Sequence, residues 1–132
     1  MSTPAPGCDN DHVPPTPDQQ ARAEQIAAEI TAILTACPYA LPGTLAVRKS
    51  QCGRRNCRCH ADPPQLHGPY NKWTRKEKGT TVTRVLGDDQ AADYRPWLAS
   101  HKRIRALLAE LERISIDITE NDPRRHRARK TP

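Results

Sequence analysis

Mostly apolar positions recur at helical spacing over two stretches of the chain. The first stretch begins at Thr16, which is placed to cap a helix, with Pro17 suited to the first helical position and Gln19 completing a capping box. Pro38 follows the last apolar position and is expected to end the helix. The apolar positions are Ala23, Ile26, Ala27, Ile30, Ile33, Leu34 and Cys37. We therefore predict an N-terminal helix in which Cys37 is a small buried hydrophobe rather than a metal ligand.

The second stretch runs over residues 97–118, at alternating steps of four and three residues. Its positions are Trp97, His101, Ile104, Leu108, Leu111, Ser115 and Ile118. Asp88 is expected to cap a preceding helical segment over 89–95, and Pro96 to kink the long helix or restart it, because proline lacks a backbone donor. Two interpretations of this stripe stay open. It packs on the first helix and the sheet, or it forms a homodimer or binds a helical protein partner.

Between the two helices the pattern changes to short runs that contain β-branched residues. It predicts strands over residues 44–50, 70–76 and 80–86. A Gly-containing turn over 77–79 joins the last two runs, which is typical of a β-hairpin. Helix, three strands and helix therefore follow one another in the order expected of a small α+β domain.

Three of the five cysteines and one histidine lie between the first two predicted strands. Cys52, Cys57 and Cys59 form a Cys-x4-Cys-x-Cys run, and a proline-containing loop then leads to His67. Three thiolates and one imidazole are ligands that tetrahedral zinc prefers, so we predict one zinc ion (Zn2+) per chain. A metal-free cluster or a redox pair is the alternative. His60 competes for the fourth position, although it adjoins Cys59 and neighbouring side chains usually point apart.

The composition makes a metal cross-link plausible as a source of stability. The chain has 132 residues with no Phe and 4% aromatic residues, so its core is modest. The predicted fold class is α+β: an N-terminal helix, a zinc-stapled three-stranded antiparallel sheet and a kinked long C-terminal helix. These elements form one domain over residues 16–120. Residues 1–15 are expected to be a disordered arm and residues 121–132 a basic flexible tail.

Charge is unevenly distributed along the chain. Residues 44–86 carry ten Lys/Arg against two acids, a net charge of +8, whereas residues 1–43 carry −4 and residues 87–122 carry −3. Such a basic concentration is typical of a surface that binds a polyanion. The expected nucleic-acid contacts are Arg48, Arg54, Arg55, Arg58, Lys72, Arg75, Lys76, Lys78 and Arg84. Arginine on a small sheet can read base edges in the major groove, and Tyr70 or Trp73 could stack on an unpaired base.

Other functional classes receive less support from the sequence. We find no nucleophile elbow, phosphate loop or carboxylate pair, and Asp62 is the only carboxylate close to the cysteines, so we do not expect an enzyme. No apolar run approaches the roughly 20 residues of a membrane span, and the N-terminus lacks a secretory signal pattern. Cysteines that bind a metal must stay reduced, so we expect the protein to be cytoplasmic. We expect no membrane partner.

Several motifs resemble those of a small bacterial family known as domain of unknown function 6788, over about residues 43–114. They are Gly43-Thr44-Leu45, Cys52-Gly53, Cys57-Arg58-Cys59 and His67-Gly68-Pro69-Tyr70. The resemblance implies the three cysteines and His67 as a set. It also implies a neighbourhood of transposable elements and hence a DNA-related role. Asn71 stands where the family is expected to have a second aromatic residue, which weakens the case for a stacking platform.

The leading functional hypothesis is therefore a cytoplasmic zinc-dependent DNA-binding or accessory protein associated with a mobile element. The alternative is a protein–protein adaptor or dimerisation module that uses residues 97–118 and in which the zinc is purely structural.

Overall fold

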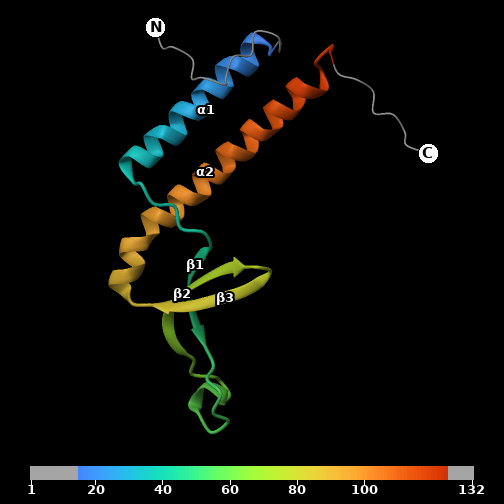
Figure 1. Ribbon diagram of the computed structural model, residues 1–132. Helices are drawn as coiled ribbons and strands as arrows, with labels where there is room; N and C mark the ends of the chain where they lie inside the picture. Colours follow the sequence, from blue (N-terminus) through green and yellow to red (C-terminus); the bar gives the residue numbers. More distant parts are fainter. Residues whose placement is uncertain (1–14, 125–132) are drawn as a thin grey trace, which may run out of the picture. The chain divides into compact units, whose positions relative to one another are not determined.

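A computed structural model describes residues 15–124 of the chain (Figure 1). They form two compact units: one of residues 33–104, and one of residues 15–32 together with residues 105–124. The element order is that of the predicted α+β fold: an N-terminal helix, three antiparallel strands and a long C-terminal helix. Of the predicted arm over 1–15 only residue 15 is described, and of the predicted tail over 121–132 only residues 121–124; Cys8 lies outside the described residues.

The helical unit contains most of α1 (Pro17–Ala36) and the C-terminal part of α2 (Asp88–Glu120). The predicted capping box is present, because the Gln19 amide donates to Thr16 Oγ1 at 3.1 Å and the Thr16 amide to Gln19 Oε1 at 2.9 Å. Ile26 on α1 and Leu107 on α2 are fully buried. The two helices thus contribute to one intramolecular core, and a homodimer through 97–118 stays a prediction.

An ion pair also links the two helices of this unit. The Arg22 guanidinium donates to both carboxylate oxygens of Glu110, with Nη2 2.7 Å from Oε1. Both side chains are partly exposed, so solvent screens this pair and it contributes little to stability. The buried apolar residues therefore dominate the stability of the helical unit.

The sheet unit contains β1 (Thr44–Ser50), β2 (His67–Glu77) and β3 (Thr80–Leu86), in the antiparallel order β1-β2-β3. The first and third strands have the predicted bounds, whereas β2 begins three residues earlier than predicted because His67 pairs with Ser50. Lys78 and Gly79 both adopt positive φ, 49° and 80°, which is the type I′ geometry of a two-residue hairpin. The predicted turn is therefore confirmed.

The beginning of α2 differs from the prediction that Asp88 caps it. The Ala91 amide donates to the Gly87 carbonyl at 2.9 Å, so the helix begins one residue earlier and Gly87 takes the capping position. The Asp88 carboxylate instead accepts from Asn71 Nδ2 at 2.8 Å, and the same amide group donates to the Leu86 carbonyl. Asn71 is buried, so these two hydrogen bonds supply the partners that its amide needs. The polar residue in the sheet core thus joins β2 to the start of α2.

Pro96 does not split the C-terminal helix. The helix runs continuously from Asp88 to Glu120, and Pro96 lies on its exposed side, where water can satisfy the carbonyl that loses its partner. Cys37 is half-buried rather than fully buried, and its thiol lies 3.6 Å from the Tyr39 carbonyl. Within residues 15–124, no helix is both long enough and apolar enough to span a membrane.

Candidate metal centre

The three cysteines lie in the connection between β1 and β2, which we call the metal loop (residues 51–66). Cys52 follows the end of β1, and Cys57 precedes a single 3-10 turn, η1 (Arg58–His60), that contains Cys59. The amides of His60 and Ala61 donate to the carbonyls three residues before them, which closes this turn. His67 is the first residue of β2 and pairs with Ser50 at the end of β1. Strand pairing therefore brings His67 beside the start of the metal loop.

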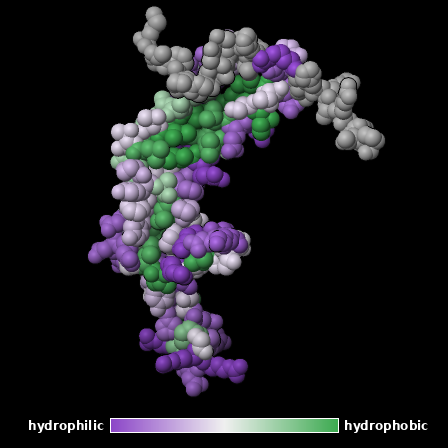
Figure 2. All heavy atoms as spheres, in the orientation of Figure 1, coloured by the Kyte–Doolittle hydropathy of each residue, from purple (hydrophilic) through white to green (hydrophobic). Residues whose placement is uncertain are grey.

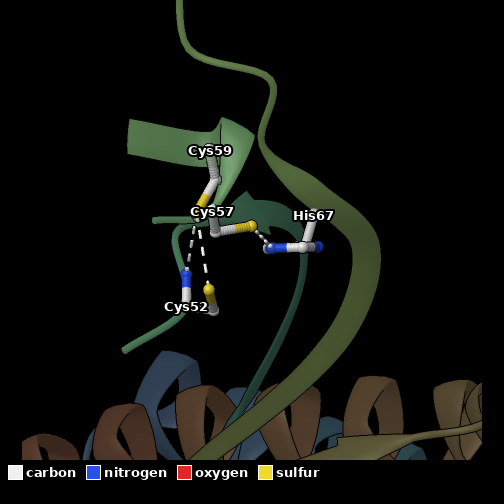
Figure 3. A group of neighbouring side chains, drawn as sticks. All are labelled: Cys52, Cys57, Cys59 and His67. Carbon is white, nitrogen blue, oxygen red and sulfur yellow. Dashed lines mark hydrogen bonds between the residues drawn. The ribbon is translucent and has the colours of Figure 1, made fainter. Parts of the chain in front are cut away.

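The four predicted ligands converge on one point (Figure 3). Their three sulfur atoms and one imidazole nitrogen all lie within 4.8 Å of one another. Cys52 Sγ lies 3.6 Å from Cys59 Sγ, and Cys57 Sγ lies 3.1 Å from His67 Nε2. Two thiolates on a tetrahedral zinc ion at about 2.3 Å lie about 3.8 Å apart, which is close to the separation of Cys52 Sγ and Cys59 Sγ. The cluster is therefore a possible metal site.

The loop gives its thiols unequal acidities. Hydrogen bonds from the Cys59 backbone amide and then from the Cys59 thiol lower the pKa of Cys57 to about 6. Burial raises the pKa of the Cys59 thiol, whose residue has no exposed surface. A metal binds the thiolate form, so Cys57 is ready to bind at neutral pH, whereas Cys59 must release a proton to the solvent. Metal affinity is therefore expected to fall as the pH is lowered.

His60 is not part of the cluster. Its Nε2 lies 2.8 Å from the Cys52 carbonyl oxygen, to which it donates, and its side chain is exposed. The amide group of Gln51 also donates across the loop, to the Cys59 carbonyl at 3.2 Å. These contacts hold the two ends of the Cys-x4-Cys-x-Cys run together. Of the two histidines that compete for the fourth position, the structure brings His67 to the cysteines and makes His60 a support of the loop.

Replacing each histidine by alanine should separate these roles. His67→Ala removes a ligand, so the variant should lose its metal to a chelator that the unchanged protein resists. His60→Ala removes only a hydrogen bond to the backbone, and we expect metal affinity to fall by about tenfold, the lower end for a residue that orients a ligand. Competition between each variant and a chromogenic chelator measures both affinities. A larger loss in His60→Ala than in His67→Ala would contradict the assignment of His67.

The predicted basic residues do not form one surface. Arg54, Arg55 and Arg58 are exposed in the metal loop, and Lys78 lies at the hairpin. Those on the strands divide between the two faces of the sheet, because residues paired across strands share a face. We call the first face the open face; it comprises Thr44, Ala46, Arg48, Tyr70, Lys72, Thr74, Lys76, Thr81, Thr83 and Val85. The other, the packed face, comprises Leu45, Val47, Asn71, Trp73, Arg75, Val82, Arg84 and Leu86.

On the packed face, Arg75 and Trp73 are engaged with each other and with nearby groups. The Arg75 guanidinium lies 4.2 Å from the Trp73 ring centroid, and its Nε donates to Glu77 at 2.8 Å. Trp73 Nε1 donates to the Pro42 carbonyl at 2.9 Å. The Trp73 ring is therefore already engaged by Arg75, whereas Tyr70 is exposed and lines an open hollow of about 500 Å³ beside Cys52 and Arg54.

Comparison with known proteins identifies one family. A family model described as a domain of unknown function (DUF6788) matches residues 17–96, more than half of the chain. The match begins at α1 rather than near residue 43 and ends at Pro96 rather than near residue 114, so the expected limits were wrong. The N-terminal helix thus belongs to the shared region and the C-terminal part of α2 does not. No curated protein and no solved structure matches the chain.

Proposed function

The chain belongs to the family described as domain of unknown function 6788, and we propose that it is a zinc-dependent nucleic-acid-binding protein, with DNA as its ligand. One observation carries this proposal: the three cysteines of the Cys3His cluster lie in a loop whose exposed arginines, Arg54, Arg55 and Arg58, have no ion-pair partner among the described residues. Figure 2 shows that the surface around this loop is mostly hydrophilic. An association with mobile elements stays a prediction from the family resemblance.

The role proposed for the metal is structural. Three thiolates and one imidazole complete a tetrahedral shell, which leaves no position where a metal-bound water could react. Thiolate-rich sites also favour zinc over the harder divalent ions. In the metal loop only Cys59 is buried, so apolar packing alone cannot hold the loop in one conformation. We therefore propose a binding protein rather than an enzyme, with zinc ordering the loop.

An ordered loop makes its arginines more effective for binding. Fixing a flexible side chain on a ligand costs conformational entropy, and a backbone that is already fixed by the metal reduces the total cost. Cationic side chains at phosphates also release counterions, which is the main source of affinity in non-specific binding. The concentration of +8 over residues 44–86 supports a polyanion as the ligand. Phosphate contacts from the metal loop are therefore the proposed basis of affinity.

Replacing Arg54, Arg55 and Arg58 by alanine tests this proposal. We expect affinity for a short random-sequence duplex to fall at least tenfold at about 50 mM salt. The slope of log affinity against log salt should become shallower by about 0.9 for each phosphate that the variant no longer neutralises. Fluorescence anisotropy at several salt concentrations measures both quantities.

The matched control removes the same charge from elsewhere. Arg95, Lys102 and Arg105 are exposed on α2, and their replacement by alanine also lowers the net charge by three. If the affinity depends on the position of the arginines rather than on the total charge, this control should bind the duplex within about twofold of the unchanged protein. Equal losses in the two variants would show that the metal loop is not the binding site. Absence of salt-dependent binding in the unchanged protein would instead favour the adaptor hypothesis.

A further inference from the structure

The two faces of the sheet differ in burial and in their polar contacts with the rest of the sheet unit. On the packed face, Asn71 and Leu86 are each 8% exposed, and this face receives the Pro42 carbonyl and the Asp88 carboxylate. None of the ten residues of the open face is buried. Within residues 15–124, no hydrogen bond or ion pair links an open-face side chain to a residue outside the sheet. The open face is thus a surface whose side chains make no polar contact with the rest of their own unit.

The chemistry of the open face is one-sided. Arg48, Lys72 and Lys76 give it three positive charges, and it contains no carboxylate. Five of its ten residues carry hydroxyl groups: Thr44, Tyr70, Thr74, Thr81 and Thr83. The remaining two are Ala46 and Val85, and Val85 is 59% exposed in the middle of a strand. A surface of cations, hydroxyls and two apolar groups without acids is complementary to an anionic, hydrogen-bonding ligand.

We propose that the open face enters the major groove of double-stranded DNA and reads its base edges. This inference rests on the nucleic-acid binding proposed above and specifies the form of nucleic acid and the surface. Three strands spaced by about 4.8 Å are about 10 Å wide between the outer backbones, which fits a groove about 12 Å wide. The major groove of duplex RNA is deep and narrow, and side chains cannot read it. Single strands bind through successive aromatic side chains, and Tyr70 is the one aromatic residue of this face.

The central cross-strand row suits base readout. Ala46, Lys72 and Val85 lie directly opposite one another on β1, β2 and β3. A lysine donates to the O6 and N7 acceptors of guanine, and small apolar side chains contact the thymine methyl group. In the next row the hydroxyls of Thr74 and Thr83 lie 3.2 Å apart, so either can also donate to or accept from a base.

The remaining cations of the open face lie away from the central row. Arg48 pairs with Tyr70 and Lys76 pairs with Thr81, on opposite sides of that row. Both side chains are exposed and long enough to reach the phosphates that border a groove. The open face therefore combines a central reading row with phosphate contacts on both sides.

Single substitutions that remove the same charge from the two faces test the inference. Lys72→Ala removes a central base contact, and we expect affinity for the preferred duplex selected from a random pool to fall about tenfold, with a flatter sequence preference. Arg84→Ala is the control, because Arg84 is exposed on the same sheet but on the packed face, and it should bind within about twofold. Val85→Ser removes both methyl groups of this exposed side chain and should weaken only duplexes with thymine at the contacted position. Equal zinc content in all variants confirms that each is folded.

Chemical footprinting of the selected duplex identifies the groove. Dimethyl sulfate methylates guanine N7 in the major groove and adenine N3 in the minor groove. We expect the unchanged protein to protect guanine N7 and to leave adenine N3 reactive. Binding with protection of adenine N3 alone, or a larger loss in Arg84→Ala than in Lys72→Ala, would overturn the assignment of this face while the proposed function stands. Failure of the unchanged protein to bind any nucleic acid would overturn both.

Discussion

Removing the metal with a chelator is expected to abolish hydrogen-exchange protection over residues 44–86 while α1 keeps its protection. The residues fully or almost fully buried in the described sheet unit are few: Cys59, Leu86, Ala91 and the polar Asn71. Structural zinc sites contribute apparent binding energies of about 10–16 kcal/mol at neutral pH, which is comparable to the whole stability of a small domain. Because the helical unit has its own core around Ile26 and Leu107, it does not depend on the metal in the same way.

Cysteine substitutions provide the matched control for this experiment. The double variant Cys57→Ser/Cys59→Ser removes two ligands and should lose both the metal and the protection of the sheet. Cys37→Ser changes a cysteine outside the cluster, and it should retain one zinc ion and the protection pattern of the unchanged protein. Re-addition of zinc to the chelated protein should restore protection. A sheet that stays protected without metal would show that its packing suffices and that the ion is dispensable.

Gly43→Ala is expected to destabilise the zinc-loaded protein by about 3 kcal/mol or more. Gly43 has a φ of +112°, a conformation that residues with a side chain rarely adopt and that costs about 1–3 kcal/mol. A Cβ atom here would lie 2.7 Å from Trp73 Nε1 and closer still to the Thr74 carbonyl oxygen, so β2 would have to move. That movement would also disturb the hydrogen bond from Trp73 to Pro42. Denaturant unfolding followed by circular dichroism measures the change.

A second glycine distinguishes backbone strain from a general effect of alanine. Gly53 lies in the metal loop and has no positive φ. Apart from atoms of the two adjacent residues, no heavy atom would lie within 4 Å of a Cβ atom at this position. Gly53→Ala should change the free energy of unfolding by no more than about 0.5 kcal/mol, as an unstrained surface substitution does. Similar effects of the two substitutions would contradict the close approach of Gly43 to β2.

Local signals in the sequence predicted the elements well. Thr16 and Gln19 carry the two halves of a capping box, and both hydrogen bonds are present in the structure. Alternation and Gly79 indicate the last hairpin, because glycine readily adopts the positive φ that the turn requires. The sequence does not show whether Asp88 is the capping residue or lies in the first turn, because aspartate is common at both positions. Its actual partner, Asn71, lies 17 positions away and carries no local signal.

The candidate site was predictable in its members but not in its surroundings. Cysteine spacing singled out the three thiols, whereas the choice between His60 and His67 depends on the pairing of Ser50 with His67 between two strands. Period-two alternation separates Lys72 from Arg75, but it does not say which face the rest of the chain covers. The predicted nucleic-acid contacts therefore combine Arg75 and Arg84 of the packed face with residues of the open face. Which face is covered depends on contacts between residues far apart in the chain, and a single sequence does not reveal those contacts.

Because His67 lies at the start of β2, a metal bound by the cluster would align β2 with β1. The cysteines are anchored to the end of β1 and the histidine to β2, so coordination fixes which residues of the two strands lie opposite each other. A shift of β2 by one residue would withdraw His67 Nε2 from the thiols and would exchange its two faces, turning Trp73 outward and Lys72 inward. A bound ion would thus disfavour misaligned pairings of β1 with β2. Coordination at one end of the sheet would thereby select the side chains presented along its whole length.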